Sequence, residues 1–378
     1  MSKITSAIIM VVGTSIGASM IAMPVSAVKV GFLGSIGLMM IIAWVMYYAA
    51  YTALDIYNIT NSDSTIAKIA GKILNLPFKI LCIIATLALL YSLVVAYISG
   101  LSGLISDATS FDYRTIVLSI AMALFISLSI SHKIFDHYNR IAFLLKTFMM
   151  SVMIFLFVPY ISLENLVASS VIADDYLSIL TIIPVFVTSF GFHASIPFIY
   201  KFVDRSDVLY HKAIKYGVGI TLFIYVIWLI LTFGAMNHCN LHDNSLDDFL
   251  SNAGLGFFNR SINFFAIFAI LTSLFGVATG LYDFLEEWLK DKFNLDNRWL
   301  ISGMTFIPPF IFSLSGKDLF IKALSFAGCA LTIIAIIVPI LIRLKLDRKG
   351  NKLLLALCFL MGIMTIIGES LIAFHIID

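Results

Sequence analysis

Two stretches of small and polar residues interrupt apolar segments, and each could release backbone groups that bind ions. The first stretch, residues 13–19, reads Gly-Thr-Ser-Ile-Gly-Ala-Ser and lies within the apolar segment 5–28. Glycine costs roughly 1 kcal/mol relative to alanine in a helix interior, so we expect this segment to form two half-helices. Freed amides at the start of a half-helix attract anions, and freed carbonyls at its end attract cations. The stretch therefore predicts a buried polar site.

The second stretch, residues 183–197, reads Ile-Pro-Val-Phe-Val-Thr-Ser-Phe-Gly-Phe-His-Ala-Ser-Ile-Pro. Pro184 and Pro197 lack the amide donor that a continuous helix uses, and Gly191 and His193 lie between them. Taken alone, this pattern also fits a kinked helix with a buried, hydrogen-bonded histidine. The case for a second half-helix pair depends on where the two stretches lie in the chain.

The composition places both stretches in a membrane. The chain has 378 residues, of which 61 % are hydrophobic and 12 % charged, whereas a soluble protein carries about 25 % charged residues. A signal peptide is the alternative for the first segment, but that run is longer and more interrupted by glycine than a signal core. We predict an all-α polytopic membrane protein with eleven spans: 5–28, 32–54, 78–106, 114–131, 140–162, 178–202, 212–236, 259–288, 298–314, 319–343 and 352–377.

The two stretches lie in the first and sixth spans, which are five apart and therefore run in opposite directions. Two interrupted helices in corresponding positions of inverted halves indicate a transporter site near the midplane. The halves would be residues 1–162 and 178–343, with 352–377 as an extra helix, all within one transporter domain over 1–378. The pairing favours two broken helices over a single kinked one.

Lysine and arginine are concentrated in alternate loops, and this sets the expected orientation. Cytoplasmic loops carry the excess of these residues, so the N-terminus is expected in the cytoplasm and the C-terminus in the periplasm. The outer loops carry acidic residues instead, which fits a solvated rim.

Three motifs resemble the hydroxy and aromatic amino acid permease family of the amino acid–polyamine–organocation superfamily. Residues 13–18 with Ala22-Met23-Pro24 are similar to its glycine-rich first helix, and 280–285 (Gly-Leu-Tyr-Asp-Phe-Leu) to the end of its eighth. Residues 189–197 resemble its sixth-helix motif and are the most specific match. The resemblance covers essentially the whole chain and implies a location in the bacterial inner membrane. It implies a LeuT-type 5+5 inverted repeat plus one helix, with helices 1 and 6 broken at mid-membrane, and proton-coupled uptake of an amino acid.

Within this family the resemblance favours tyrosine as substrate. Tryptophan or phenylalanine follow, and serine or threonine are the small-substrate alternative. The expected partners are the amino acid, a proton or a sodium ion, and membrane lipid, with the chain as a monomer or homodimer.

A zwitterionic amino acid needs both kinds of half-helix end. We expect its carboxylate on the amides of Gly17, Ala18 and Ser19, with the hydroxyl of Ser15 or Ser19 as a further donor. We expect its ammonium on carbonyls of the first and sixth spans. The candidate residues on the two breaks are Gly13, Thr14, Ser15, Ile16, Gly17, Ala18, Ser19, Ser189, Phe190, Gly191, Phe192 and His193. Among these residues, the carbonyls expected to bind the ammonium are those of Gly13 or Thr14 and of Ser189 or Phe190.

Selection of the side chain needs a pocket of its own. Phe190 and Phe192 flank the second break and could stack on an aromatic substrate, and His193 could bind a phenol hydroxyl or join an internal network. Tyr91 lies near the middle of the third span and Phe275 near the middle of the eighth. The resemblance implies that those spans line the site. Each aromatic residue could equally serve packing or face lipid.

One lysine, Lys146, lies about two turns into the fifth span. A lysine there is costly unless it is paired, solvated or extended to the interface. Burial disfavours its charged form, so Lys146 could load and release a proton. In related amine-transporting folds a fifth-helix lysine occupies the place of a sodium ion, and its neighbours here would be carbonyls of the first span and Thr272 or Ser273. Sodium coupling through those same groups is the alternative.

The other ionisable groups have simpler interpretations. Asp283, Glu286 and Glu287 with Lys290 are spaced for pairing along one helix and favour a cytoplasmic charge cluster or gate, and Asp55 is interpreted in the same way. Glu369, near the outer end of the last span, either extends to the interface or packs at a subunit contact.

The sequence predicts neither an enzyme nor a cofactor. It contains no H-E-x-x-H motif or phosphate-binding loop and no pattern of pore-lining repeats that would suggest a channel. His238-Cys239 with His242-Asp243 lacks the spacing of a tetrahedral metal site, so no metal is expected. The scattered cysteines indicate no disulfide framework. We expect no nucleic-acid partner.

Overall fold

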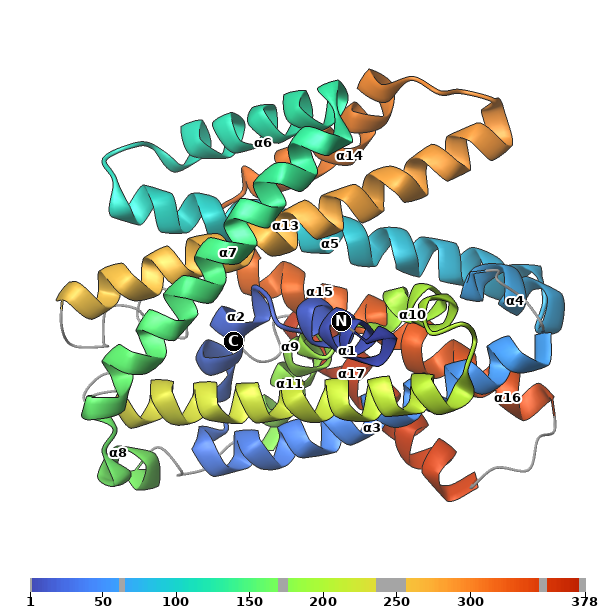
Figure 1. Cartoon of the computed structure of the whole chain (residues 1–378), viewed down its shortest axis with the longest axis horizontal. Coiled ribbons are helices and arrows are strands. Elements are labelled where there is room, and N and C mark those ends of the chain that lie inside the picture. The colour runs from blue at the N-terminus through green and yellow to red at the C-terminus, as the bar shows by residue number, and fades with distance from the viewer. Residues whose placement is uncertain (1, 61–64, 169–175, 236–255, 347–351, 374–378) are drawn as a thin grey trace. The chain divides into compact units, whose positions relative to one another are not determined.

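The structure is a computed structural model that describes residues 2–60, 65–168, 176–235, 256–346 and 352–373 (Figure 1). Those residues form helices and connecting turns and contain no strand. The helices in chain order are α1 Lys3–Ser15, α2 Ser19–Ala27, α3 Gly31–Thr60, α4 Ile66–Ile73, α5 Leu76–Ala108, α6 Tyr113–Ile130, α7 His132–Phe157, η1 Val158–Tyr160, α8 Leu163–Ala168, α9 Tyr176–Ser189, η2 His193–Ser195, α10 Ile196–Phe202, α11 Asp207–Ala235, α13 Gly256–Phe293, α14 Arg298–Ser313, α15 Leu319–Thr332, η3 Ile333–Ile337, α16 Val338–Lys345 and α17 Lys352–Ala373.

Most of these helices are built to cross a bilayer. In the described part of the chain, nine helical segments are long and apolar enough to span, or ten if the bent pair α1 and α2 counts as one crossing. Each of the eleven predicted spans coincides with a helix or a helix pair. The predicted span 298–314 does not reach the length of a crossing, because α14 has 16 residues, whereas a straight crossing takes about 20. The all-helical, multi-pass prediction is confirmed, and the number eleven stays a prediction.

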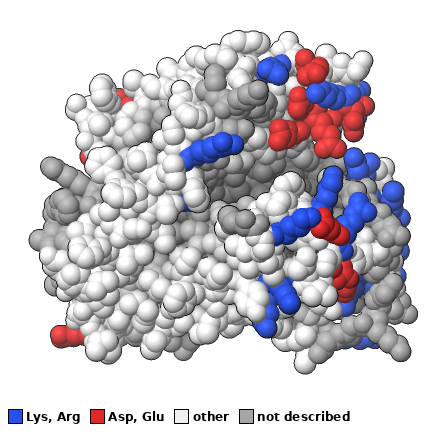
Figure 2. Space-filling model, viewed as in Figure 1, with Lys and Arg blue, Asp and Glu red and all other residues white. Residues whose placement is uncertain are grey.

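The surface of the helices agrees with a lipid environment. Large apolar side chains are widely exposed, among them Phe155 at 80 %, Phe223 at 65 % and Leu33 at 63 %. Figure 2 shows that much of the face in view carries no charged side chain. Soluble monomers rarely expose apolar surface on this scale, so these side chains are suited to contact lipid.

The chain divides into two compact units, and each takes segments from both predicted halves. The first unit comprises Met1–Ala88, Leu166–Ile230 and Ser325–Asp378. In it, α9 packs against α17 and α2, and α3 packs against α16. The second unit comprises Leu89–Asn165 and Leu231–Leu324. In it, α7 crosses α13 and α6 packs against α14 (Figure 1).

Two glycines let neighbouring helices approach α9 within the first unit. A Cβ atom added to Gly328 of α15 would lie 1.9 Å from the Pro184 carbonyl oxygen, and one added to Gly368 of α17 would lie 2.0 Å from that of Leu180. Any side chain at these positions would push its helix away from α9. Small residues serve this purpose in membrane helix packing, where backbones come into direct contact. The first half of the interrupted helix, α9, is therefore held between α15 and α17.

Contacts between helix ends within each unit follow the predicted sides of the membrane. In the first unit Lys3 pairs with Asp204, and the Arg343 guanidinium lies 3.0 Å from the Asp55 carboxylate; all four residues are predicted at cytoplasmic ends. In the second unit the Lys317 ammonium lies 3.3 Å from the Asp107 carboxylate, at ends predicted to be outer.

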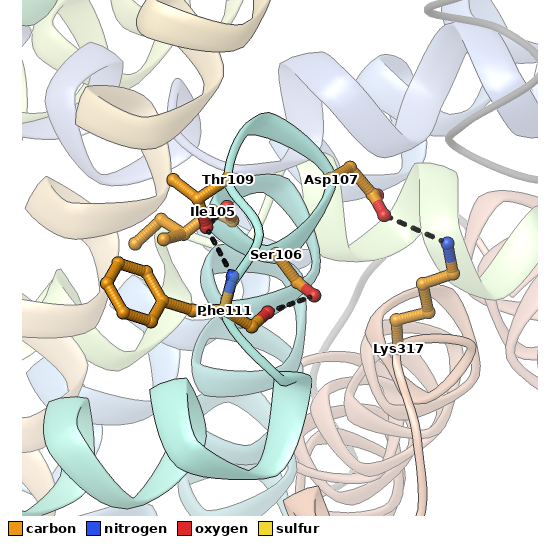
Figure 3. Close-up of polar contacts among 6 residues, drawn as sticks. All are labelled: Ile105, Ser106, Asp107, Thr109, Phe111 and Lys317. Atoms are coloured by element: carbon orange, nitrogen blue, oxygen red, sulfur yellow. Dashed lines mark hydrogen bonds and ion pairs between the residues drawn. The ribbon is translucent and has the colours of Figure 1, made fainter.

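Figure 3 shows the pair of Asp107 and Lys317 beside the turn that joins α5 to α6. The Thr109 hydroxyl donates to the Ile105 carbonyl (2.7 Å), and the Ser106 hydroxyl donates to the Phe111 carbonyl (3.1 Å). These bonds close the turn and fix the end of α5, from which Asp107 reaches Lys317.

Candidate functional site

The first helix is interrupted between Ser15 and Ser19. α1 ends at Ser15, α2 begins at Ser19, and the two axes differ by 54°. The Ile16 N–H still donates to the Val12 carbonyl at 2.8 Å, and the next helical bond runs from the Met20 N–H to the Gly17 carbonyl at 3.1 Å. The residues of the break are buried. The first amides of a helix and its last carbonyls have no partner within it, so both kinds of group gather at this break.

The candidates on either side of this break differ in exposure. Gly13 and Thr14 lie inside α1 and are exposed, and the Thr14 hydroxyl donates to the Met10 carbonyl at 2.8 Å. Ser15 is 3 % exposed, and its hydroxyl has no hydrogen-bond partner among the described residues. The Ser15 hydroxyl is thus a buried donor left over at the end of α1.

The second interruption follows Ser189, where α9 ends. The Phe190 N–H donates to the Val187 carbonyl (3.1 Å) and the Gly191 N–H to the Thr188 carbonyl (3.0 Å), so the last turn tightens before the chain leaves the helix. A 3-10 turn over His193–Ser195 then leads into α10. The sixth predicted span is therefore two helical segments joined by an irregular turn.

The aromatic residues of the second break face protein. Phe190 and Phe192 are fully buried. Phe190 packs edge-on against Tyr225, and Phe192 lies against the His193 ring at 4.5 Å between centroids. The His193 Nε2 atom is 3.1 Å from the Met46 carbonyl oxygen of α3. We expected His193 to bind a substrate phenol or to join an internal network, and the structure shows a contact with the protein's own backbone.

One side chain joins the two interruptions. The hydroxyl of Tyr225, on α11, donates to the Ser15 carbonyl at 2.8 Å and lies 3.3 Å from the Ser189 carbonyl oxygen. These carbonyls belong to the last residues of α1 and α9. The two predicted half-helix ends therefore lie close to each other. Tyr225 was not predicted from the sequence, since nothing in its neighbours distinguishes it from the other tyrosines of the chain.

The candidates from the third and eighth predicted spans lie in the second unit. The Tyr91 hydroxyl donates to the Met304 carbonyl of α14 at 2.8 Å, so its polar end is engaged in helix packing. Phe275 is buried on α13. The Thr272 and Ser273 hydroxyls, also on α13, both donate to the Ala269 carbonyl, at 2.9 and 3.1 Å.

Lys146 is buried in α7. Its side chain is 7 % exposed, and its ammonium lies 5.1 Å from the centre of the Phe143 ring, one turn earlier. A cation over an aromatic face gains electrostatic attraction, which partly replaces lost hydration. α7 packs along α13, the helix that carries Thr272 and Ser273. The burial disagrees with the alternative in which Lys146 extends to the membrane interface.

The remaining ionisable groups have partners within the fold. Arg343 of α16 pairs with Asp55 of α3, and Lys290 lies 3.0 Å from Glu286 on the same helix. The Ser325 hydroxyl donates to the Glu369 carboxylate, so Glu369 packs against α15 of its own chain. No group of metal-binding side chains occurs among the described residues. His238, Cys239, His242 and Asp243 lie outside them.

Comparison with known proteins assigns the chain to a family. Residues 1–371 match the tryptophan/tyrosine permease family. The chain belongs to that family. The permease is 29 % identical to tyrosine-specific transport system 1 of Haemophilus influenzae, with 96 % of each chain covered. It is 27 % identical to the tryptophan-specific transport protein of the same organism, over 95 % of this chain and 93 % of the relative.

The fold of the permease is that of a membrane transporter. Among solved structures it is similar to a mutant of the Eremococcus coleocola manganese transporter, with a TM-score of 0.67, 12 % identity, and coverage of 96 % of this chain and 84 % of that one. At that identity the likeness concerns the fold alone. The predicted family is confirmed, and the permease is a multi-pass inner-membrane protein of amino acid transport.

Proposed function

We propose that this permease moves an aromatic amino acid, tyrosine first, into the cytoplasm by proton-coupled symport and alternating access. The observation that carries the proposal is the meeting of two helix interruptions, with the last carbonyls of α1 and α9 both beside the Tyr225 hydroxyl. Helix ends that meet inside a bundle offer dipoles of both signs to a zwitterion. Full-length similarity to a tyrosine-specific relative supports tyrosine as the substrate.

The substrate carboxylate would bind at the start of α2. Gly17, Ala18 and Ser19 supply the first amides of that helix, where the dipole is positive. The break is buried, so a charge-assisted hydrogen bond there is weakened little by water. The buried Ser15 hydroxyl, without a partner among the described residues, is available as a further donor. The assignment thus gives the carboxylate a site of backbone donors.

The substrate ammonium would bind to carbonyls at the ends of α1 and α9. Gly13 and Thr14 belong to the last turn of α1, and Ser189 ends α9. Terminal carbonyls carry the negative end of the helix dipole. Phe190 and Phe192 follow directly after this site and would adjoin the substrate ring. The ammonium and the ring of the substrate would then be bound by adjacent parts of one turn.

The architecture we propose is the LeuT-type arrangement of eleven spans, with repeats over residues 1–162 and 178–343 and an extra helix over 352–377. The N-terminus would be cytoplasmic and the C-terminus periplasmic. Pairing between ends of the same predicted side, as in Lys3 with Asp204 and Asp107 with Lys317, supports this topology. Lys146 would carry the coupled proton, with its burial in α7 as support.

Ligand-dependent stabilisation tests the substrate assignment. Tyrosine at about 100 times its dissociation constant should stabilise the purified permease by about 2.7 kcal/mol, measured as a rise in the midpoint of thermal unfolding in detergent. Tryptophan, phenylalanine, serine and threonine are compared at equal concentration, and D-tyrosine serves as the control for non-specific effects. We expect the largest rise with L-tyrosine. A rise with serine or threonine and none with any aromatic amino acid would refute the aromatic assignment.

A further inference from the structure

We infer that Tyr225 is a positioning residue whose hydroxyl fastens the two helix interruptions to each other. Its hydroxyl reaches the carbonyls of Ser15 and Ser189, at 2.8 and 3.3 Å. Tyr225 and Ser189 are fully buried and Ser15 is 3 % exposed, so water does not compete for these bonds. The last carbonyls of a helix lack donors within it. One phenol proton shared between two helix ends therefore fixes their separation.

A second donor on the same helix holds the other side of the first break. The indole N–H of Trp228, one turn after Tyr225, donates to the Met20 carbonyl of α2. Tyr225 therefore holds the last residue of α1, and Trp228 holds the first turn of α2. A helix presents residues three or four apart on one face, so a single face of α11 spans the break.

A close contact between α11 and a side chain of α1 makes this possible. Gly217 lies two turns before Tyr225 on the same face of α11. A Cβ atom added to Gly217 would lie 2.6 Å from the Val11 side chain of α1. Residues 217, 221, 225 and 228 recur at intervals of four, four and three, as one face of a helix requires. The small residue brings α11 against α1, and the two aromatic donors then reach the break.

The ring of Tyr225 has a separate role from its hydroxyl. It packs edge-on against Phe190, with 5.7 Å between ring centroids and 62° between planes. A phenylalanine at position 225 would keep this packing and lose only the donor. The hydroxyl can therefore be removed without opening a cavity.

The consequence for transport rests on the proposed function. The carbonyls that Tyr225 holds belong to the backbone that would meet the ammonium, a group common to all amino acids. Loss of the hydroxyl should weaken binding of tyrosine and phenylalanine by the same factor. A residue that reads the substrate side chain would instead change the ratio of the two affinities.

The test compares Tyr225→Phe with Tyr210→Phe. Tyr210 is also fully buried on α11, and its hydroxyl donates to the Ala50 carbonyl in the interior of α3 at 3.1 Å, so the control loses an equivalent bond away from the breaks. Amide hydrogen exchange of the substrate-free protein is measured over residues 16–22 and 190–195. We expect about tenfold faster exchange in Tyr225→Phe, as the loss of one buried hydrogen bond predicts, and wild-type exchange there in Tyr210→Phe. Equal exchange at both breaks in wild type and Tyr225→Phe would overturn the inference.

A binding measurement separates positioning from a general effect on folding. The dissociation constants of tyrosine and phenylalanine should both rise about tenfold in Tyr225→Phe and stay unchanged in Tyr210→Phe. A change in the dissociation constant of tyrosine alone would show that Tyr225 contacts the substrate side chain and would contradict its positioning role. If no aromatic amino acid binds the wild type, the proposed function fails, and the exchange measurement still decides the inference.

If Tyr225→Phe does not fold, Trp228→Phe replaces it. We then expect faster exchange over residues 20–24 on the α2 side of the break. Wild-type exchange in that segment would contradict the inference that side chains of α11 hold the first break.

Discussion

Replacing Lys146 with alanine is expected to abolish accumulation driven by a pH gradient while substrate binding is retained. The side chain is 7 % exposed and lies over Phe143, so its ammonium group is removed from bulk water. A group of this kind can load a proton on one side of the membrane and release it on the other. Without it, tyrosine would still equilibrate across the membrane, and the inside-to-outside concentration ratio would fall to about 1, since no coupling energy is available.

The measurement is uptake of labelled tyrosine by proteoliposomes with an imposed pH gradient, beside binding of the same ligand in detergent. Arg140→Ala is the matched control, because Arg140 is an exposed base on the same helix. Driven accumulation by Lys146→Ala at the wild-type level would exclude Lys146 as the proton carrier. Loss of binding together with accumulation would give Lys146 a structural role instead.

The second large effect concerns the two charged ends of the substrate. Tyramine lacks the carboxylate and 3-(4-hydroxyphenyl)propionate lacks the ammonium, and we expect each to bind about 30- to 100-fold more weakly than tyrosine. Each analogue leaves charge-assisted hydrogen bonds unmade at a buried helix end, which costs about 2–3 kcal/mol, and 1.4 kcal/mol corresponds to tenfold. The measurement is competition against labelled tyrosine in detergent.

Phenylalanine is the control for this comparison, because it keeps both charged ends and loses only the phenol hydroxyl. We expect it to bind far better than either analogue. Tyramine competing as well as tyrosine would show that the amides of Gly17, Ala18 and Ser19 do not hold a carboxylate. The same result with the deaminated acid would remove the carbonyls of α1 and α9 from the ammonium site.

The places where the helices break could be predicted from the sequence because glycine acts locally, whereas Pro24 and Pro184 lie inside α2 and α9. Gly17 lies in the interruption between α1 and α2, and Gly191 in the one after α9. The apolar runs likewise gave the positions of the helices, since a crossing needs a minimum length of apolar residues. These features depend on residues that are neighbours in the chain.

The partners of the breaks could not be predicted in this way. Tyr225 is one of 15 tyrosines, and its role follows from the packing of α11 against α1. Tyr91 was a candidate for the substrate pocket because it lies near the middle of the third predicted span, yet its hydroxyl donates to the Met304 carbonyl. Asp55 was predicted at a charged helix end, and its pairing with Arg343 depends on α3 and α16 being neighbours. Contacts between distant segments carry no local signal, so they emerge only in the folded chain.

The most direct test of the central claim is uptake of labelled tyrosine by proteoliposomes of the wild-type permease, with proton and sodium gradients imposed separately. We predict accumulation above equilibrium under a proton gradient, its collapse on addition of a protonophore, and none under a sodium gradient alone. Accumulation driven only by sodium would contradict proton coupling. No accumulation of any aromatic amino acid under a proton gradient would contradict the account as a whole.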